Sequence, residues 1–317
     1  YGIMRDAIDT FVRGAGTRNP NSPLQGGLVI FAAGNEGDVY GDVRIYPAAY
    51  DPVIAVGAMD WSFRPAYYTD YGPWVDIAAP GGDRYSGKTT RTASDGRTVF
   101  YSNAQILSTI LCDDAIAYQD GRKDGGMYGY GFMQGTSMAC PHVSGVAALG
   151  LSYAVKQRRH FKADEFVKLL KESVKPVNSF YTGTKKFYRN SASHGASLTQ
   201  MNLSAYIDKM GTGAANAGIL LNNIEGSGSD MKVPNVYVAE NAESTINLAG
   251  FFIDGEKLTY TCTSSDEAVA KVTVNGTLMK VTGVKTGSAH ITVKVSNGTE
   301  QTITVTVRKK ANDNGWM

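Results

Sequence analysis

Apolar positions in the first two-thirds of the chain follow two different periods. Residues 28–33 are continuously apolar, which predicts a parallel strand buried on both faces. Residues 3–12 and 164–174 carry apolar side chains three and four positions apart, which predicts amphipathic helices. A further apolar run with helical spacing follows Ser137. Strands that alternate with helices predict an α/β domain with a parallel sheet.

The pattern changes after a polar, Gly- and Ser-rich segment, which predicts a flexible linker. Short alternating runs then predict strands at 236–238, 258–261, 269–274, 278–281, 289–295 and 302–307. Asn275-Gly276 between two of these runs is a strong hairpin signal. The segment resembles a bacterial Ig-like domain, for which a spacer role is expected. The predicted division is a domain at 1–224, a linker at 225–231, a small all-β Ig-like sandwich at 232–310 and a tail at 311–317.

Candidate chemistry lies at the start of the apolar run after Ser137. Residues 135–145 read Gly-Thr-Ser-Met-Ala-Cys-Pro-His-Val-Ser-Gly. This stretch resembles the nucleophile signature of the subtilisin-like serine proteases, the subtilases. A serine at a helix N-terminus has its oxygen near the positive end of the helix dipole, which favours a developing alkoxide. We expect Pro141 in the first helical turn, and Gly145 and Gly150 where the helix packs closely on a sheet.

A second segment carries the same resemblance. Residues 32–37 read Ala-Ala-Gly-Asn-Glu-Gly directly after the predicted strand, and subtilases use this turn to supply the side-chain amide of the oxyanion hole. The resemblance therefore implies Ser137 as nucleophile and Asn35 as oxyanion-hole donor. It also implies substrate-binding positions at Ala32, Ala33, Gly34 and Thr136. Similar stretches at 46–58, 71–81, 106–109 and 211–217 extend the resemblance over residues 2–222, with a subtilisin-like three-layer fold that is incomplete at its N-terminus.

The catalytic base is missing from this pattern. Subtilases carry their Asp and His upstream of the Ala-Ala-Gly-Asn strand, whereas no His precedes Ser137 here. His142 belongs to the signature and is expected to be structural, and His194 would require a permuted chain. A serine without a base is a poor nucleophile. We therefore expect an upstream segment of the same precursor to supply the Asp and His, and the chain alone to be inactive.

Composition is that of an ordinary globular protein. A net charge of +2 with interspersed signs gives no indication of binding to nucleic acid or a membrane surface, and no apolar run is expected to reach transmembrane length. Three cysteines cannot all pair within the chain. No cofactor is expected to be required and no metal site is predicted. The Asp residues at 113–124 lack a calcium-loop spacing, and whether the protein binds calcium is left open.

Three functions remain open at this point. The first is a serine endopeptidase that hydrolyses peptide bonds of a peptide or protein substrate through an acyl-enzyme. The second is a catalytically inactive subtilase-like subunit that binds or scaffolds. In the third, adhesion by the Ig-like module is the working activity. The family resemblance implies a secreted, cell-surface or periplasmic protein.

Overall fold

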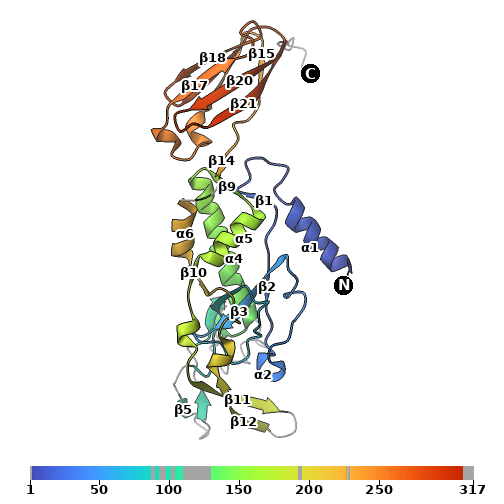
Figure 1. Ribbon diagram of the computed structural model, residues 1–317, viewed down its shortest axis with the longest axis vertical. Coiled ribbons are helices and arrows are strands. Elements are labelled where there is room, and N and C mark those ends of the chain that lie inside the picture. The colour runs from blue at the N-terminus through green and yellow to red at the C-terminus, as the bar shows by residue number, and fades with distance from the viewer. Residues whose placement is uncertain are drawn as a thin grey trace. The chain divides into compact units, whose positions relative to one another are not determined.

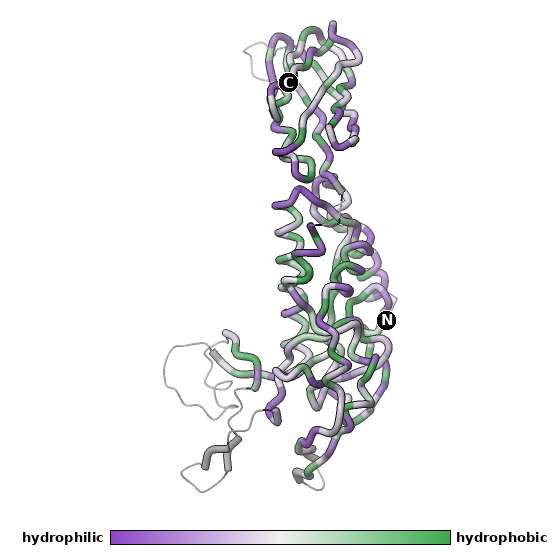
Figure 2. Tube along the Cα trace, turned by 60° about the vertical axis from the view of Figure 1, so that its left-hand side comes forward, coloured by the Kyte–Doolittle hydropathy of each residue, from purple (hydrophilic) through white to green (hydrophobic). Residues whose placement is uncertain are grey.

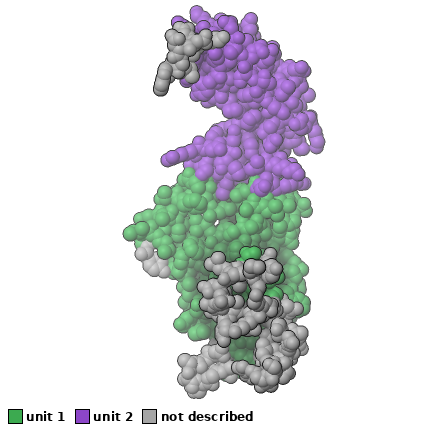
Figure 3. Space-filling model, turned by 180° about the vertical axis from the view of Figure 1, so that it is seen from behind, with its two compact units in different colours: residues 1–15, 26–151, 162–224 green, residues 16–25, 152–161, 225–317 purple. Residues whose placement is uncertain are grey.

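The computed structural model describes residues 2–86, 90–92, 98–100, 104–109, 130–191, 195–225, 227 and 229–309. The chain forms two compact units (Figure 3). The N-terminal unit comprises residues 1–15, 26–151 and 162–224, and the C-terminal unit comprises residues 16–25, 152–161 and 225–317. The sequence placed residues 16–25 and 152–161 in the first domain, but they belong to the C-terminal unit. The other predicted domain bounds stay a prediction.

The N-terminal unit contains a five-stranded sheet (Figure 1). Its order is β10 (Val174–Lys175), β13 (Ala214–Ala215), β4 (Ile77–Pro80), β3 (Val53–Met59) and β2 (Val29–Ala32). The last four of these strands are parallel, and β10 pairs antiparallel with β13. All residues of β3 are buried, as an apolar strand with neighbours on both sides requires. The predicted parallel sheet and the strand at 28–33 are confirmed, but β2 is half-buried at the edge of the sheet and is not buried on both faces as predicted.

The helices are α1 (Gly2–Gly14), α2 (Gly37–Tyr40), α4 (Thr136–Lys156), α5 (Ala163–Glu172) and α6 (Ala217–Glu225). Single-turn 3-10 helices lie at η2 (Asn178–Phe180), η3 (Leu203–Tyr206), η4 (Leu248–Gly250) and η5 (Gly255–Lys257). Short antiparallel pairs are β5 (Thr90–Thr92) with β6 (Thr98–Phe100), β7 (Ile106–Thr109) with β8 (Tyr130–Met133), and β11 (Thr184–Ser191) with β12 (Gly195–Asn202). The predicted helix at 164–174 is shorter than expected, because Val174 belongs to β10.

Helix α4 departs from the sequence-based expectation in two respects. Pro141 lies in its second turn, and without an N–H it leaves the Ser137 carbonyl without a helical donor. Gly150 packs against α6, since a Cβ there would lie 2.6 Å from Leu220, whereas no described atom lies within 4 Å of a Cβ at Gly145. The prediction that both glycines pack against a sheet was therefore wrong.

Helix α4 is also long and apolar enough to cross a membrane by length and composition alone. The expectation that no apolar segment reaches this length was therefore wrong. A core helix of a globular domain passes the same test, and the side chains of Ala139, Val143 and Ala147 are buried. We draw no membrane assignment from α4.

Helix α1 is amphipathic, but little of its apolar face is buried. Of the predicted face, Ile8 is buried, whereas Ile3 and Phe11 are 89% and 51% exposed. Strand β2 is likewise half-buried along its whole length and is the outer strand of the sheet. In the described part of the unit, apolar side chains therefore remain partly or largely exposed on the edge strand β2 and on helix α1.

The C-terminal unit begins with a small three-stranded sheet. Its order is β1 (Leu24–Gln25), β9 (Arg159–Lys162) and β14 (Ser229–Asp230). Asp230 lies in the segment that the sequence predicted as a flexible linker. Its carboxylate instead accepts a hydrogen bond from the Ile253 N–H at 2.8 Å, and its strand pairs with β9. This part of the predicted linker is therefore ordered structure.

Two further sheets of this unit enclose one apolar core. One sheet has the order β15 (Val236–Ala239), β21 (Glu300–Arg308), β20 (Gly287–Val295), β17 (Tyr260–Ser264), and the other has the order β16 (Glu243–Asn247), β19 (Leu278–Gly283), β18 (Ala270–Asn275). Buried residues of both sheets share a single cluster, and hydrophobic and hydrophilic positions alternate along the strands (Figure 2). The Asn275-Gly276 hairpin is confirmed between β18 and β19. The sequence missed β16, whose polar residues give no strand signal.

A buried ion network joins β11 to the loops beside the main sheet. The Lys185 ammonium lies 2.8 Å from an Asp60 oxygen and 2.6 Å from an Asp83 oxygen, and it also donates to the Pro65 carbonyl. The side chain of Lys185 is 3% exposed, and both carboxylates are fully buried. Burial alone would raise the pKa of Asp60, but the charge and hydrogen bonds of Lys185 lower it overall.

We expect Lys185→Met to lower the free energy of unfolding by about 3–5 kcal/mol, because it leaves the buried Asp83 carboxylate without this cation and Asp60 with only Arg64, 3.4 Å away. Urea unfolding at pH 7 measures the loss. Lys186→Met is the matched control, since Lys186 is the next residue of the same strand and is exposed. Equal stabilities of the two variants would contradict this role of Lys185.

Candidate active site

Ser137 lies in the first turn of α4, directly after a sharp glycine turn. Gly135 has a φ of +152°, and its N–H donates to the Gly81 carbonyl at 3.0 Å. The Ser137 side chain is exposed and makes no hydrogen bond within the described residues. The N–H groups of the first helical turn point towards the same end of the helix, where the dipole favours negative charge. The Thr136 N–H donates to Asn35, and the N–H groups of Met138 and Ala139 donate to the Gly135 carbonyl, so an incoming carbonyl could reach the Ser137 hydroxyl and the Ser137 backbone N–H.

Asn35 is tied to the residue before Ser137 by two hydrogen bonds. Its Oδ1 accepts from the Thr136 N–H at 2.9 Å and from the Thr136 hydroxyl at 3.0 Å. A backbone N–H can only donate, so the atom that faces it must be the amide oxygen. The amide nitrogen points elsewhere and has no partner among the described residues. This Asn35 N–H₂ group therefore remains available to donate to a ligand.

The segment at 78–81, which the sequence grouped with these motifs, supports the nucleophile loop. The Tyr68 hydroxyl is hydrogen-bonded to the carbonyls of Gly81 and Gly82, at 2.9 and 2.6 Å. Burial, together with the nearby Asp83, raises the pKa of Tyr68, which therefore stays a neutral donor. The Gly81 carbonyl in turn accepts from Gly135. Tyr68, Gly81 and Gly135 are thus joined by hydrogen bonds directly before Ser137.

The predicted substrate-binding positions divide into two groups. Ala32 and Gly34 are half-buried, at the end of β2 and in the turn that follows. Ala33 and Thr136 are fully buried. The Thr136 hydroxyl also accepts from the Gly34 N–H at 3.2 Å, so this side chain positions Asn35. The four substrate-binding positions, Thr136 included, stay a prediction.

None of the described histidines is hydrogen-bonded to Ser137. The His142 ring nitrogen lies 2.7 Å from the Met138 carbonyl one turn below, as expected for a structural residue. His160 and His290 belong to the C-terminal unit, and His194 lies outside the described residues. No group of three His, Cys, Asp or Glu side chains in the described ranges is arranged to hold a metal ion. The Asp residues weighed for calcium at 113–124 also lie outside those ranges.

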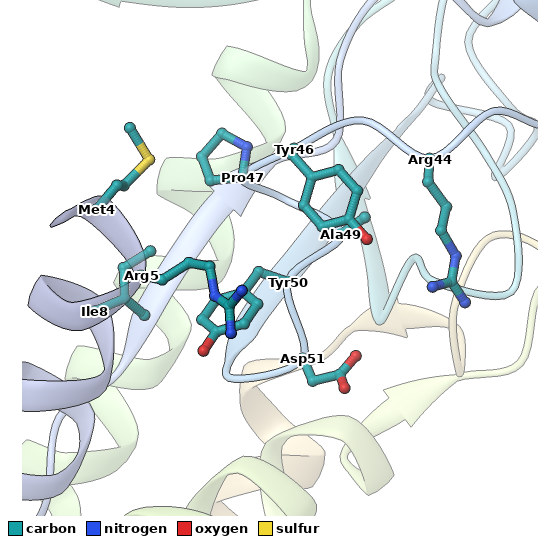
Figure 4. A pocket seen from close by; sticks show the side chains of 9 residues that line it. All are labelled: Met4, Arg5, Ile8, Arg44, Tyr46, Pro47, Ala49, Tyr50 and Asp51. Atoms are coloured by element: carbon teal, nitrogen blue, oxygen red, sulfur yellow. The ribbon is translucent and has the colours of Figure 1, made fainter. Parts of the chain in front are cut away.

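A pocket of about 620 Å³ opens between α1 and residues 44–51 (Figure 4). Met4 and Ile8 contribute apolar surface from the helix, and Tyr46 and Tyr50 contribute aromatic surface from the loop. The Tyr50 hydroxyl donates to Asp9 at 2.8 Å, which ties the helix to this loop. The charged residues that line the pocket are Arg5, Arg44 and Asp51.

Curated relatives of known activity match parts of this chain. A thermophilic serine proteinase of Bacillus sp. (strain AK1) is 38% identical over 39% of this chain and 21% of its own length. The major intracellular serine protease of Bacillus subtilis (strain 168) is 33% identical over 49% of this chain and 38% of its own length. The chain thus spans well under half the length of these relatives. Other matched relatives are named as extracellular.

A crystal structure of a serine protease of Aeromonas sobria resembles this chain at a TM-score of 0.45 and 12% identity, over 96% of this chain and 64% of that one. A similarity of this size supports no statement about activity. The model of the Subtilase family matches residues 4–228. This match covers most of the chain and includes both Asn35 and Ser137. The chain therefore belongs to the subtilase family.

Proposed function

We propose that this chain is the nucleophile-bearing part of a subtilisin-type serine endopeptidase. The observation that carries the proposal is the pair of hydrogen bonds from Thr136 to Asn35 Oδ1, which holds the Asn35 amide beside Ser137 with its N–H₂ group free. In this proposal the Ser137 hydroxyl attacks the carbonyl carbon of the scissile peptide. The Asn35 N–H and the Ser137 backbone N–H donate to the oxygen as it gains charge.

The reaction also needs a base and an acid that orients it, and we assign both to an upstream segment of the same precursor. In the first step the base takes the Ser137 proton while the new C–O bond forms. It then returns that proton to the leaving amine as the C–N bond breaks, which leaves an acyl-enzyme that water hydrolyses. No metal or other cofactor enters these steps.

The open apolar surfaces of the N-terminal unit support such a segment. The outer edge of β2 offers unpaired backbone groups of the kind that parallel sheets normally cover. Leu149 is 48% exposed on α4, on a helix whose opposite side is buried. Ile3 and Phe11 are exposed on α1. We propose that the upstream segment pairs with β2 and covers these side chains, with the pocket beside Met4 and Ile8 on its path.

Asn35→Leu in the complete protein is expected to lower kcat about 10²–10³-fold with little change in KM, because the amide acts mainly on the transition state. That magnitude was measured in subtilisin, a member of the same family. Steady-state hydrolysis of a chromogenic peptide measures it. Asn35→Asp is the informative companion, since it keeps an acceptor for Thr136 but loses the donor. If Asn35→Asp retained the wild-type kcat, the donor role of Asn35 would be wrong.

The catalytically inactive subunit and the adhesion function remain rival proposals. The two-sheet core of residues 233–307 supports an Ig-like assignment for the C-terminal sandwich, which we propose to be a spacer. A location outside the cytoplasm is also a proposal, since the matched relatives include both extracellular and intracellular proteases. Calcium binding stays open.

A further inference from the structure

Asp70 is a buried carboxyl group directly behind the turn that carries Asn35. Its N–H donates to the Gly34 carbonyl at 3.0 Å, and its Oδ1 accepts from the Glu36 N–H at 2.9 Å. The residue is 2% exposed. Its other oxygen, Oδ2, is buried and has no hydrogen-bond partner among the described residues. A buried carboxylate oxygen without a hydrogen-bond donor costs folding free energy, so the environment of Oδ2 needs an explanation.

A second carboxyl group converges on the same place. Glu36 Oε2 accepts from the Asn35 N–H at 2.9 Å. A Cβ built on Gly34, whose φ is +125°, would lie 1.9 Å from Asp70 Oδ2 and 3.2 Å from Glu36 Oε2. The two carboxyl oxygens therefore border the same glycine, on which any side chain would collide with Asp70. No local sequence pattern indicates this contact, because Asp70 lies 34 positions after Glu36.

Among the described residues, no cation faces Asp70 to balance two negative charges. The other titratable groups that face Asp70 are Asp38 of α2 and Tyr206 of η3, and the Tyr71 ring lies tilted against that of Tyr206. The cation on this side, Lys209, is paired with Asp42 at 2.9 Å. Burial, reinforced by the charge of Glu36, raises the pKa of Asp70 to about 7.

We propose that Asp70 and Glu36 share one proton at neutral pH, and that this acid pair positions the Gly34–Asn35–Glu36 turn. Asp70 carries the proton on Oδ2 and donates it to the Glu36 carboxylate, which satisfies the orphaned oxygen. Glu36 is thereby held where it accepts from the Asn35 N–H. When the proton leaves to solvent, two adjacent carboxylates repel and this support of Asn35 weakens. Only the catalytic consequence rests on the proposed protease function.

The direction of the pH effect follows from proton linkage. In the unfolded chain Asp70 has its ordinary pKa of 3.8, whereas in the folded protein it has a pKa of about 7. Between these values the folded state binds the additional proton. Its contribution to stability therefore falls as pH rises from about 4 to about 7 and is constant above that range. Asp70→Asn removes this dependence, because the amide donates to Glu36 permanently and still accepts from the Glu36 N–H.

The first test compares urea unfolding of the complete protein and its Asp70→Asn variant at pH 5 and pH 8. The folding equilibrium constant of the wild type, relative to the variant, is expected to fall at least about tenfold between these pH values. Asp70→Asn is expected to be the more stable protein at pH 8. Glu172→Gln, which neutralises a carboxylate that is 59% exposed on α5, is the matched control and should show no such change. A ratio independent of pH, or a less stable Asp70→Asn protein at pH 8, would overturn the proposal.

The second test follows the Asp70 carboxyl carbon by ¹³C NMR as pH is varied. We expect its titration near pH 7 in the wild type, and at lower pH in Glu36→Gln, where a neutral amide can donate to Asp70. Titration of the wild type near pH 4 would refute proton sharing. The third readout is the kcat of Asp70→Asn divided by that of the wild type, which should rise above pH 7 at constant KM. A flat kcat ratio would exclude the positioning role, whereas complete absence of protease activity would refute only the proposed function.

Discussion

Ser137→Ala in the complete protein is expected to lower kcat for peptide hydrolysis by about 10⁶-fold, because no other described side chain can form the acyl-enzyme. This magnitude comes from subtilisin, where removal of the serine alone costs about as much as removal of the whole triad. The residual rate would come from substrate binding and from the donors around Asn35. Single-turnover assays with an activated peptide ester, which report acyl-enzyme formation as a burst, measure the loss.

Ser144→Ala is the matched control for this substitution. Ser144 lies on the same helix and is exposed, but its hydroxyl donates to the Cys140 carbonyl one turn earlier. Its loss should leave the burst unchanged. A Ser137→Ala protein that still showed a burst of full amplitude would remove Ser137 from the mechanism and favour the inactive-subunit alternative.

The 317-residue chain without any companion polypeptide is expected to hydrolyse peptides about 10⁶-fold more slowly than the complete protein, since Ser137 has no base among the described residues. Addition of a separately expressed upstream segment should restore activity and should also cover α1. Fluorescence of a dye placed at residue 3, which is 89% exposed, reports the second event. Robust activity of the purified chain, abolished by Ser137→Ala, would contradict this expectation.

Recovery of activity and association of the upstream segment, taken together, distinguish the protease from the inactive-subunit function. Association of the upstream segment without recovery of activity would indicate a scaffold or binding subunit. If neither association nor activity were found, the exposed edge of β2 would no longer support the protease proposal. Recovery of both would link the open sheet edge to the catalytic reaction.

The parallel sheet and the positions of Ser137 and Asn35 could be predicted because they depend on local signals. A continuous apolar run specifies a buried strand, and the glycine turns mark the strand end and the helix start. The amphipathic helix α1 was predicted equally well, yet its apolar side chains are largely exposed. Periodicity indicates which face is apolar but does not indicate what covers it.

Contacts between residues distant in sequence could not be predicted in this way. Lys185 lies 125 positions from Asp60 and reads as an ordinary strand lysine, although both side chains are buried. The contact made by the Thr136 side chain could not be predicted for a related reason. Its position within the signature suggested contact with substrate, whereas only the folded chain shows that its hydroxyl is occupied by Asn35.

The hydrogen bonds between Thr136 and Asn35 also affect how structural distortions would change the spacing of Asn35 and Ser137. Because the Asn35 amide is bonded to the residue next to Ser137, a shift of α4 relative to β2 strains these hydrogen bonds before it can separate Asn35 from Ser137. The two hydrogen bonds therefore oppose a change in the spacing between these residues. In the proposed mechanism, a base from the upstream segment would have to be positioned only against Ser137, because Asn35 is already held beside it.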